Sequence, residues 1–207
     1  MKLYLSSYRL GNHADFLSAN VLGKKRIAVI SNALDFSQDL DRLEQSKQKE
    51  FTALESIGFT PIELDLRNFF GKKDELLETV LTLDAVWVVG GNTFILRRAM
   101  YQSGFDEIIT DLKGNDNFVY AGYSAGICVL SPTLRGIHLT DDPDYIPALY
   151  DKCIIWEGLK FVPFCFAPHY RSNHFESEAI EKSVEYYIEN KIPFIALKDG
   201  EEYIGKV

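Results

Sequence analysis

The chain has 207 residues, 46% of them hydrophobic, and a formal net charge of -8 at pH 7. This length favours one domain that spans residues 1–207 and has a substantial core. It is too short to suggest two domains of ordinary size. The acidic balance and the lack of a Lys/Arg cluster exclude an obvious nucleic-acid surface. There is no apolar run of membrane-spanning length and no secretory signal, so we expect a cytoplasmic protein without nucleic-acid or membrane partners.

The three cysteines, Cys128, Cys153 and Cys165, form no CxxC pair and would leave one thiol unpaired if two were bridged. This usage is typical of a reducing compartment and gives no zinc-binding pattern. We therefore expect neither a metal nor a cofactor.

Short apolar runs alternate with longer amphipathic segments along the chain, a pattern typical of strands joined by helical crossovers. The predicted strands are residues 3–5, 26–30, 61–64, 85–89, 117–121, 161–168 and 192–197. Helices are predicted over residues 35–58 and 174–187, and others start near residues 94 and 126. Several strands are apolar on both faces, so the predicted fold class is α/β: a doubly wound, mostly parallel sheet with helices on both faces.

The stretch Gly122-Tyr123-Ser124-Ala125-Gly126 follows an apolar strand and can begin a helix. A serine between glycines at such a strand-to-helix turn is typical of an exposed nucleophile. The small flanking residues relieve crowding at the tight turn. Ser124 is therefore the candidate nucleophile of a hydrolase.

A serine nucleophile needs a base, and the chain has four histidines. His169 follows the predicted strand 161–168, which places it at the same sheet edge as Ser124. His174 is interpreted as a helix-cap or exposed residue and His13 as solvated, while His138 could face the core or the cleft. A strand-end histidine bonded to a backbone carbonyl remains the alternative for His169.

The base in turn needs an acceptor that orients it, and Asp199 follows the predicted strand 192–197. The sequence Lys198-Asp199-Gly200 is equally typical of an ordinary hairpin turn, so spacing alone leaves both interpretations open. Competing acids are Asp141, Asp142, Asp144 and Glu201.

Attack on a carbonyl requires N–H donors for the developing oxyanion. The amide of Ala125 and that of Gly91, which follows the strand 85–89, are the candidates. Asn92 is a candidate substrate-binding residue, although a helix N-cap is the simpler explanation. Neither GxGxxG nor GxxxxGK[ST] occurs, which disfavours a nucleotide site. The irregular segment 136–151 is expected to border the site.

The chain resembles the peptidase E family of aspartyl dipeptidases and their cyanophycinase relatives. The resemblance rests on three motifs in combination: Gly90-Gly91-Asn92-Thr93, the GxSAG elbow around Ser124, and Pro168-His169-Tyr170. The resemblance covers nearly the whole chain and implies a class I glutamine amidotransferase-like fold. It also implies a serine peptidase for small peptides, with Ser124 as nucleophile, His169 as base and Asp199 as the acid, where relatives often have glutamate. The order serine, histidine, acid differs from that of α/β-hydrolases.

The resemblance implies an arginine, in the helix after the catalytic histidine, that pairs with an aspartyl substrate. The matching segment 174–181 is acidic and has none. Arg171 and Arg135 are candidate substitutes in substrate binding, with a solvated surface position as the alternative for both. Two other functions are considered: a catalytically silent protein that binds a metabolite or partner, and an amidotransferase-like enzyme whose nucleophile is Cys128 or Cys165. The cysteines lie in apolar runs, which favours core thiols.

Overall fold

The computed structural model describes residues 1–207, and its centre is a six-stranded sheet with the order β3-β2-β4-β5-β1-β8. All neighbouring strands are parallel except β8, which runs antiparallel to β1. The strands are β1 (Lys2–Ser6), β2 (Arg26–Ile30), β3 (Thr60–Glu63), β4 (Ala85–Val88), β5 (Val119–Tyr123) and β8 (Glu202–Lys206). The predicted mostly parallel α/β sheet is confirmed.

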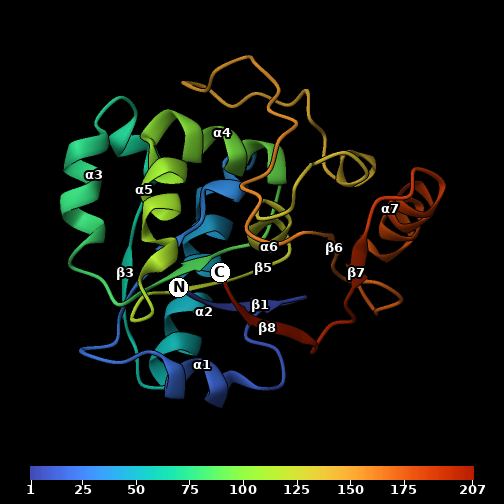
Figure 1. Cartoon of the computed structure of the whole chain (residues 1–207). Coiled ribbons are helices and arrows are strands. Elements are labelled where there is room, and N and C mark those ends of the chain that lie inside the picture. Colours follow the sequence, from blue (N-terminus) through green and yellow to red (C-terminus); the bar gives the residue numbers. More distant parts are fainter.

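Helices cover both faces of this sheet (Figure 1). One face packs against α1 (Ala14–Asn20) and α2 (Leu40–Ser56), and the other against α3 (Lys73–Val80), α4 (Thr93–Ser103) and α5 (Phe105–Asp111). Alternate residues of each strand point to opposite faces, so Ile27 joins one apolar cluster and Ala28 the other. Burial on both faces explains why the inner strands β2, β4, β5 and β1 are largely continuous apolar runs, whereas the edge strands β3 and β8 are more exposed and more polar.

A second, two-stranded parallel sheet lies beyond the β1 and β8 side of the molecule (Figure 1). It pairs β6 (Cys165–Ala167) with β7 (Phe194–Ala196), and α7 (Ser177–Glu189) forms the crossover between them. Because Ala167 is paired with Ala196, the residues that follow the two strands emerge side by side. This register brings the segment of His169 next to that of Asp199.

Several predicted boundaries were wrong. Of the strand predicted over residues 161–168, only Cys165–Ala167 (β6) forms a strand. The helix predicted from residue 35 begins at Leu40. Asp39 defines that start, because its side chain accepts a hydrogen bond from the Arg42 amide. The predicted helix 174–187 begins later, at Ser177. Short 3-10 helices occupy Asn32–Leu34, Leu66–Phe69, Leu112–Gly114 and Ile137–Leu139.

The turn at Lys198-Asp199-Gly200 is not part of a two-stranded hairpin. The strand before it, β7, pairs with β6, whereas the strand after it, β8, pairs with β1 in the main sheet. The segment therefore links the two sheets and places Asp199 between them. None of the helices has the length and apolar character needed to cross a bilayer.

Candidate active site

Ser124 lies on a sharp turn between β5 and the short helix α6 (Ala125–Cys128), with φ +50° and ψ -115°. A non-glycine residue rarely adopts this conformation, and strain of this kind is concentrated at functional sites. The turn packs tightly against β4: a Cβ at Gly126 would lie 2.2 Å from the carbonyl oxygen of Val88, and one at Gly122 2.6 Å from it. Glycine at these two positions lets the turn approach β4 and present Ser124 to the cavity.

The backbone amides of Ala125 and Gly91, both near Ser124, donate no hydrogen bond within the protein. The Ala125 amide begins α6. Gly91 has φ +140°, and a Cβ there would lie 2.4 Å from the carbonyl oxygen of Ala33, so only glycine is accommodated. Unpaired amides are uncommon in folded proteins, and donors of this kind can stabilise an oxyanion.

His169 and Asp199 are in direct contact: Nδ1 of the imidazole lies 2.7 Å from Oδ1 of the carboxylate. Ser7, at the end of β1, connects both residues, because its hydroxyl donates to Asp199 at 3.0 Å and accepts from the His169 amide at 2.8 Å. The amide of Asp199 donates to Oγ of Ser172 at 2.8 Å. Asp199 is thus held from both sides in a position that orients the imidazole.

The environment of His169 keeps its imidazole neutral. Burial lowers the pKa of His169, against the opposing effect of the hydrogen bond to Asp199, and nearby His174 lowers that pKa further. A carboxylate can only accept, so Nδ1 carries the proton and Nε2 keeps its lone pair. A neutral imidazole with a free Nε2 is the form that a general base requires.

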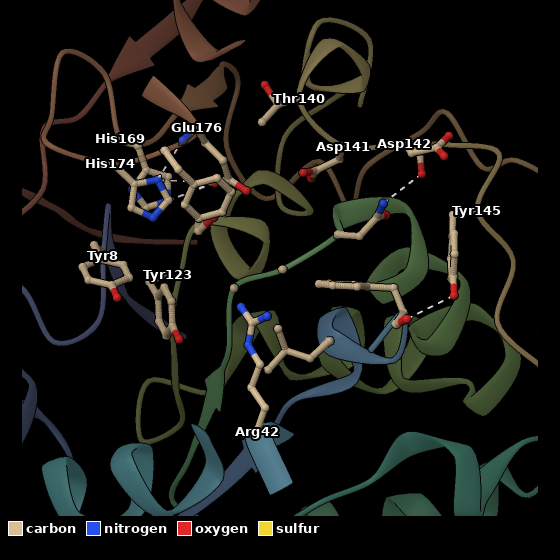
Figure 2. Close-up of a pocket in the computed structure, with 17 residues that line it drawn as sticks. Tyr8, Arg42, Tyr123, Thr140, Asp141, Asp142, Tyr145, His169, His174 and Glu176 are labelled. Atoms are coloured by element: carbon tan, nitrogen blue, oxygen red, sulfur yellow. Dashed lines mark hydrogen bonds and ion pairs between the residues drawn. The ribbon is translucent and has the colours of Figure 1, made fainter. Parts of the chain in front are cut away.

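Ser124 and His169 line one cavity of about 520 Å³, together with Tyr8, Gly91 and Asn92 (Figure 2). No hydrogen bond joins Ser124 to His169. Contacts of this type are often long in the absence of substrate. The segment 136–151 borders the cavity as expected, since Thr140, Asp141, Asp142 and Tyr145 all line it.

His174 lies just before α7, where its Nδ1 accepts from the Glu176 amide, as expected of a residue in the cap region, but its ring also lines the cavity, which was not predicted. Its ring stacks on that of His169, with centroids 3.7 Å apart and planes 7° apart, and Tyr8 packs edge-on against both rings. Oε2 of Glu176 lies 3.6 Å from Nε2 of His169 and 3.7 Å from Nδ1 of His174. Figure 2 shows this group on one wall of the cavity.

That wall also carries buried carboxyl groups. Burial raises the pKa of Glu176 to about 7, and the nearby charges of Asp141 and Asp199 add to the effect. Burial also raises the pKa of Asp141 to about 6, although its carboxylate accepts a hydrogen bond from the Thr93 amide at the start of α4. Neither carboxylate has a Lys or Arg partner.

The structure gives Asn92 a structural role. Its side-chain oxygen accepts from the amides of Phe94 and Ile95, and its Nδ2 donates to the carbonyl of Asp142 at 2.8 Å. Asn92 therefore caps α4 and fastens the segment 136–151 to it. It also lines the cavity, and the second N–H of its Nδ2 has no partner within the protein, so it can still donate to a substrate.

Arg171 and Arg135 do not line the cavity, so the structure favours the alternative considered for both, a surface position, over a role in substrate binding. Arg171 is exposed and pairs with Glu181 at 3.3 Å, while the exposed Arg135 lies over the ring of Trp156. The arginine that does line the cavity is Arg42, in the first turn of α2. Figure 2 shows its guanidinium directed toward the cavity from the side opposite Glu176.

The remaining candidates lie away from the cavity. Cys128 and Cys165 are buried core thiols, and burial raises the pKa of both, which disfavours a reactive thiolate. His138 accepts from the Gly136 amide beside Trp156, and the exposed His13 pairs with Glu202.

The profile of peptidase family S51 matches residues 12–203 of the chain. The chain belongs to this family. A relative in Drosophila melanogaster, named a probable alpha-aspartyl dipeptidase, is 29% identical over 96% of the chain and 80% of its own length. The Streptomyces coelicolor peptidase E is 34% identical over 56% of the chain, and an uncharacterized Listeria innocua peptidase is 32% identical over 60%. These two matches span 46% and 56% of the relatives' own lengths.

Solved structures of similar proteins share the fold of this S51 member. A putative peptidase E from Listeria monocytogenes superposes with a TM-score of 0.74 at 22% identity, covering 100% of this chain and 98% of its own. A peptidase from an acI-B1 actinobacterium gives 0.72 at 18% identity, covering 99% and 83%. At these identities the likeness establishes the fold.

The sequence analysis of this S51 chain did not predict that three side chains with charged or imidazole groups line the cavity: Arg42, His174 and Glu176. The spacing His169-x4-His174-x-Glu176 within one short loop was the available signal for two of them. Arg42 offered no such signal, because its position depends on how α2 packs beside the strand ends.

Proposed function

We propose that the chain is a serine peptidase in which Ser124 is the nucleophile, His169 the general base and Asp199 the residue that orients the base. The observation that carries this proposal is the contact between His169 and Asp199 on the wall of the cavity that contains Ser124. Membership of peptidase family S51 supports it independently. The parts come from three separate segments of the chain.

In the proposed reaction Ser124 attacks a peptide carbonyl and passes its proton to Nε2 of His169. The amides of Gly91 and Ala125 donate to the resulting oxyanion, since both are free of other partners. His169 then protonates the leaving amine, and the peptide C–N bond breaks to give an acyl-serine. Water, deprotonated by the same imidazole, hydrolyses this ester and restores Ser124.

The proposed substrates are small peptides that include Asp-Xaa dipeptides. A cavity of about 520 Å³ is of the size that holds a short peptide. Carboxyl groups on one wall face a single arginine, Arg42, on the other. This arrangement complements a peptide with a free amino group and a carboxylate, and the fly relative named a probable alpha-aspartyl dipeptidase supports the same class.

A catalytically silent binding protein is the competing function. Such a protein gains nothing from a strained serine beside two free amides, so these features favour catalysis. The deciding experiment is hydrolysis of a dipeptide panel, with and without amino-terminal aspartate, by the native protein and by Ser124→Ala. Cleavage that depends on Ser124 supports the proposal. Cleavage that survives Ser124→Ala, or no cleavage of any peptide, contradicts it.

A further inference from the structure

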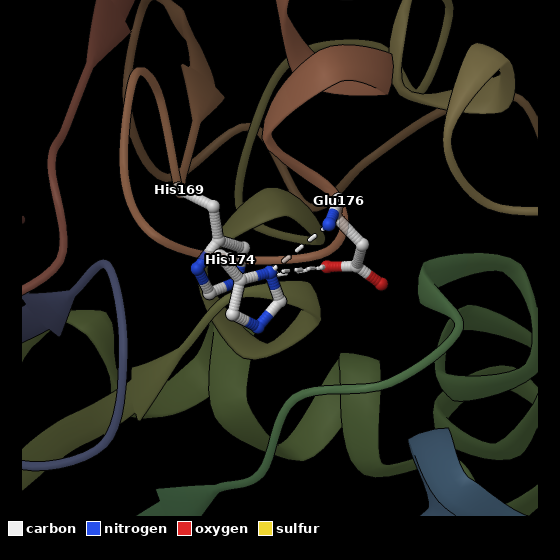
Figure 3. Close-up of side chains that lie close together, drawn as sticks. All are labelled: His169, His174 and Glu176. Atoms are coloured by element: carbon white, nitrogen blue, oxygen red, sulfur yellow. Dashed lines mark hydrogen bonds and ion pairs between the residues drawn. The ribbon is translucent and has the colours of Figure 1, made fainter.

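Three side chains of one loop place possible metal-binding atoms close together: His169, His174 and Glu176 (Figure 3). One such atom from each residue lies within 4.8 Å of the others. Oε2 of Glu176 is 3.6 Å from Nε2 of His169 and 3.7 Å from Nδ1 of His174. With bonds of about 2.0–2.1 Å, donor atoms of a tetrahedral zinc site are separated by about 3.3–3.4 Å. The spacing needs only small side-chain movements. Because a metal–nitrogen bond lies in the plane of the imidazole, the two parallel rings must also tilt apart so that both lone pairs point at one ion.

The surroundings of the two histidines suit metal binding. Histidine ligands usually donate their second ring N–H to a carboxylate or carbonyl, and Nδ1 of His169 lies 2.7 Å from Asp199. Nδ1 of His174 accepts a long hydrogen bond, 3.3 Å, from the Glu176 amide, so its lone pair already points toward the loop interior. A metal ion would replace that contact.

The charges on this wall of the cavity favour a cation, and the arginine of the cavity, Arg42, lies on the opposite side. Glu176 has no Lys or Arg partner, and Asp141 and Asp142 line the same cavity. Two imidazoles and one carboxylate form a set of borderline donors that suits Zn²⁺ better than Mg²⁺ or Ca²⁺, which prefer oxygen alone. Because the group lines an open cavity, a water molecule can complete a tetrahedron.

We propose that His169, His174 and Glu176 form a zinc-class metal site that reversibly inhibits the enzyme. The inhibition, though not the binding, rests on the proposed function. A metal bound to Nε2 of His169 occupies the lone pair that must accept the proton of Ser124. Metal binding and peptide cleavage then exclude each other at one nitrogen atom. The pattern of cysteines says nothing about such a site, because it contains no thiolate.

The test is calorimetric titration with Zn²⁺, at fixed neutral pH, in a Cys153→Ser background that removes the one exposed thiol. We expect one zinc per chain, and at least about tenfold weaker binding in both His174→Ala and Glu176→Gln. His13→Ala is the matched control, because His13 also pairs with a glutamate, Glu202, outside the cavity. Circular dichroism verifies that each variant is folded.

Zinc binding that is absent, or equally strong in both site variants and the native protein, overturns the site. Dipeptide hydrolysis in the same Cys153→Ser protein tests the inhibition: activity should fall with an inhibition constant equal to the calorimetric Kd and return on adding EDTA. Full activity at saturating zinc overturns the inhibitory role. If no peptide is cleaved even without zinc, the proposed function fails, whereas the calorimetry still decides the metal site.

Discussion

The imidazole rings of His169 and His174 lie parallel, 3.7 Å apart between centroids. Protonation of His169 during catalysis therefore places a positive charge directly against a second imidazole. The presence of His174 lowers the pKa of His169, in addition to the larger effect of burial. The stack thus couples a residue outside the proposed Ser124, His169 and Asp199 set to the candidate base.

His174→Ala should raise the pKa of His169, because it removes a neighbour that disfavours the imidazolium and admits water to the ring. The base is active only when neutral, so the acid limb of the kcat/KM profile should move to higher pH. The measurement is the pH dependence of dipeptide hydrolysis. His13→Ala, which changes a histidine outside the cavity, should leave the limb in place. If the acid limb of His174→Ala lies at the same pH as that of the native protein, or at a lower pH, the coupling is contradicted.

Asp199→Asn should lower kcat by about 10³–10⁴ while the protein stays folded, because an amide can hold the imidazole in the wrong tautomer. Steady-state kinetics measure the loss, and circular dichroism verifies the fold. Asp116→Asn is the control, since Asp116 is exposed and pairs with Lys206 far from the cavity. If Asp199→Asn retains native kcat, then another group orients His169.

Gly126→Ala should destabilise the protein by about 1–3 kcal/mol or more and abolish activity, because its Cβ would lie 2.2 Å from the Val88 carbonyl oxygen. Urea unfolding measures the free energy. Gly114→Ala is the matched control, since a Cβ there meets nothing within 4 Å. Equal stabilities of the two variants would refute the close packing of the elbow on β4.

The buried carboxyl of Glu176 predicts a pH-dependent stability. Its pKa in the folded protein is about 7, above the ordinary value of 4.5, so folding favours its protonated form. The free energy of unfolding should fall as pH rises from about 4 to 7. Glu176→Gln removes the ionisable group. The change in the free energy of unfolding caused by this substitution should therefore be more favourable at pH 8 than at pH 4, by on the order of 2 kcal/mol.

Urea unfolding at the two pH values measures this difference. Glu178→Gln changes an exposed glutamate near the start of the same helix and should show little pH-dependent effect. If Glu176→Gln changes the free energy of unfolding by the same amount at both pH values, then ionisation of the Glu176 carboxyl does not destabilise the folded protein.

The sequence predicted most of the sheet because a strand that is buried on both faces has a continuous run of apolar residues, as in residues 26–30. It also predicted that Ser124 and His169 lie close together, and both line one cavity. The expected reason was wrong, because β5 belongs to the six-stranded sheet and β6 to the separate two-stranded sheet, so the two residues do not share a sheet edge. It did not predict that His174 faces the cavity. A histidine three residues before a helix looks solvent-exposed in one dimension, and only the fold of the loop 169–176 turns it onto His169.

The arginines show the same limit for side-chain direction. Arg171 is two residues from His169 in sequence, yet the backbone at His169 and Arg171 has positive φ, and the Arg171 side chain points to Glu181 at the surface. Arg42 is far from Ser124 in sequence but lines the cavity because α2 begins beside it. Proximity in sequence placed Arg171 in a segment next to the cavity but could not decide the direction of its side chain.

Arg42→Ala should therefore raise KM for peptides that carry a carboxylate near the scissile bond, because this arginine is the cation that lines the cavity. We expect a loss of about 10-fold to 100-fold in kcat/KM for Asp-Leu, typical of a charged hydrogen bond worth about 1.5–3 kcal/mol. Arg42→Lys should recover only part, since an ammonium cannot make the paired contacts of a guanidinium. The two exposed arginines provide controls: Arg171→Ala and Arg135→Ala should change these values little.

The choice of peptides shows which carboxylate Arg42 recognises. A loss for Asp-Leu and Asp-Leu-amide but not for Ala-Leu assigns it to the aspartyl side chain. A loss for Asp-Leu and Ala-Leu that is absent for Asp-Leu-amide assigns it to the terminal carboxylate. Equal losses for all three, or the same loss in Arg171→Ala, would show that Arg42 does not select an acid. The acidic wall opposite would then be the only charged feature left to orient a peptide, through its amino group.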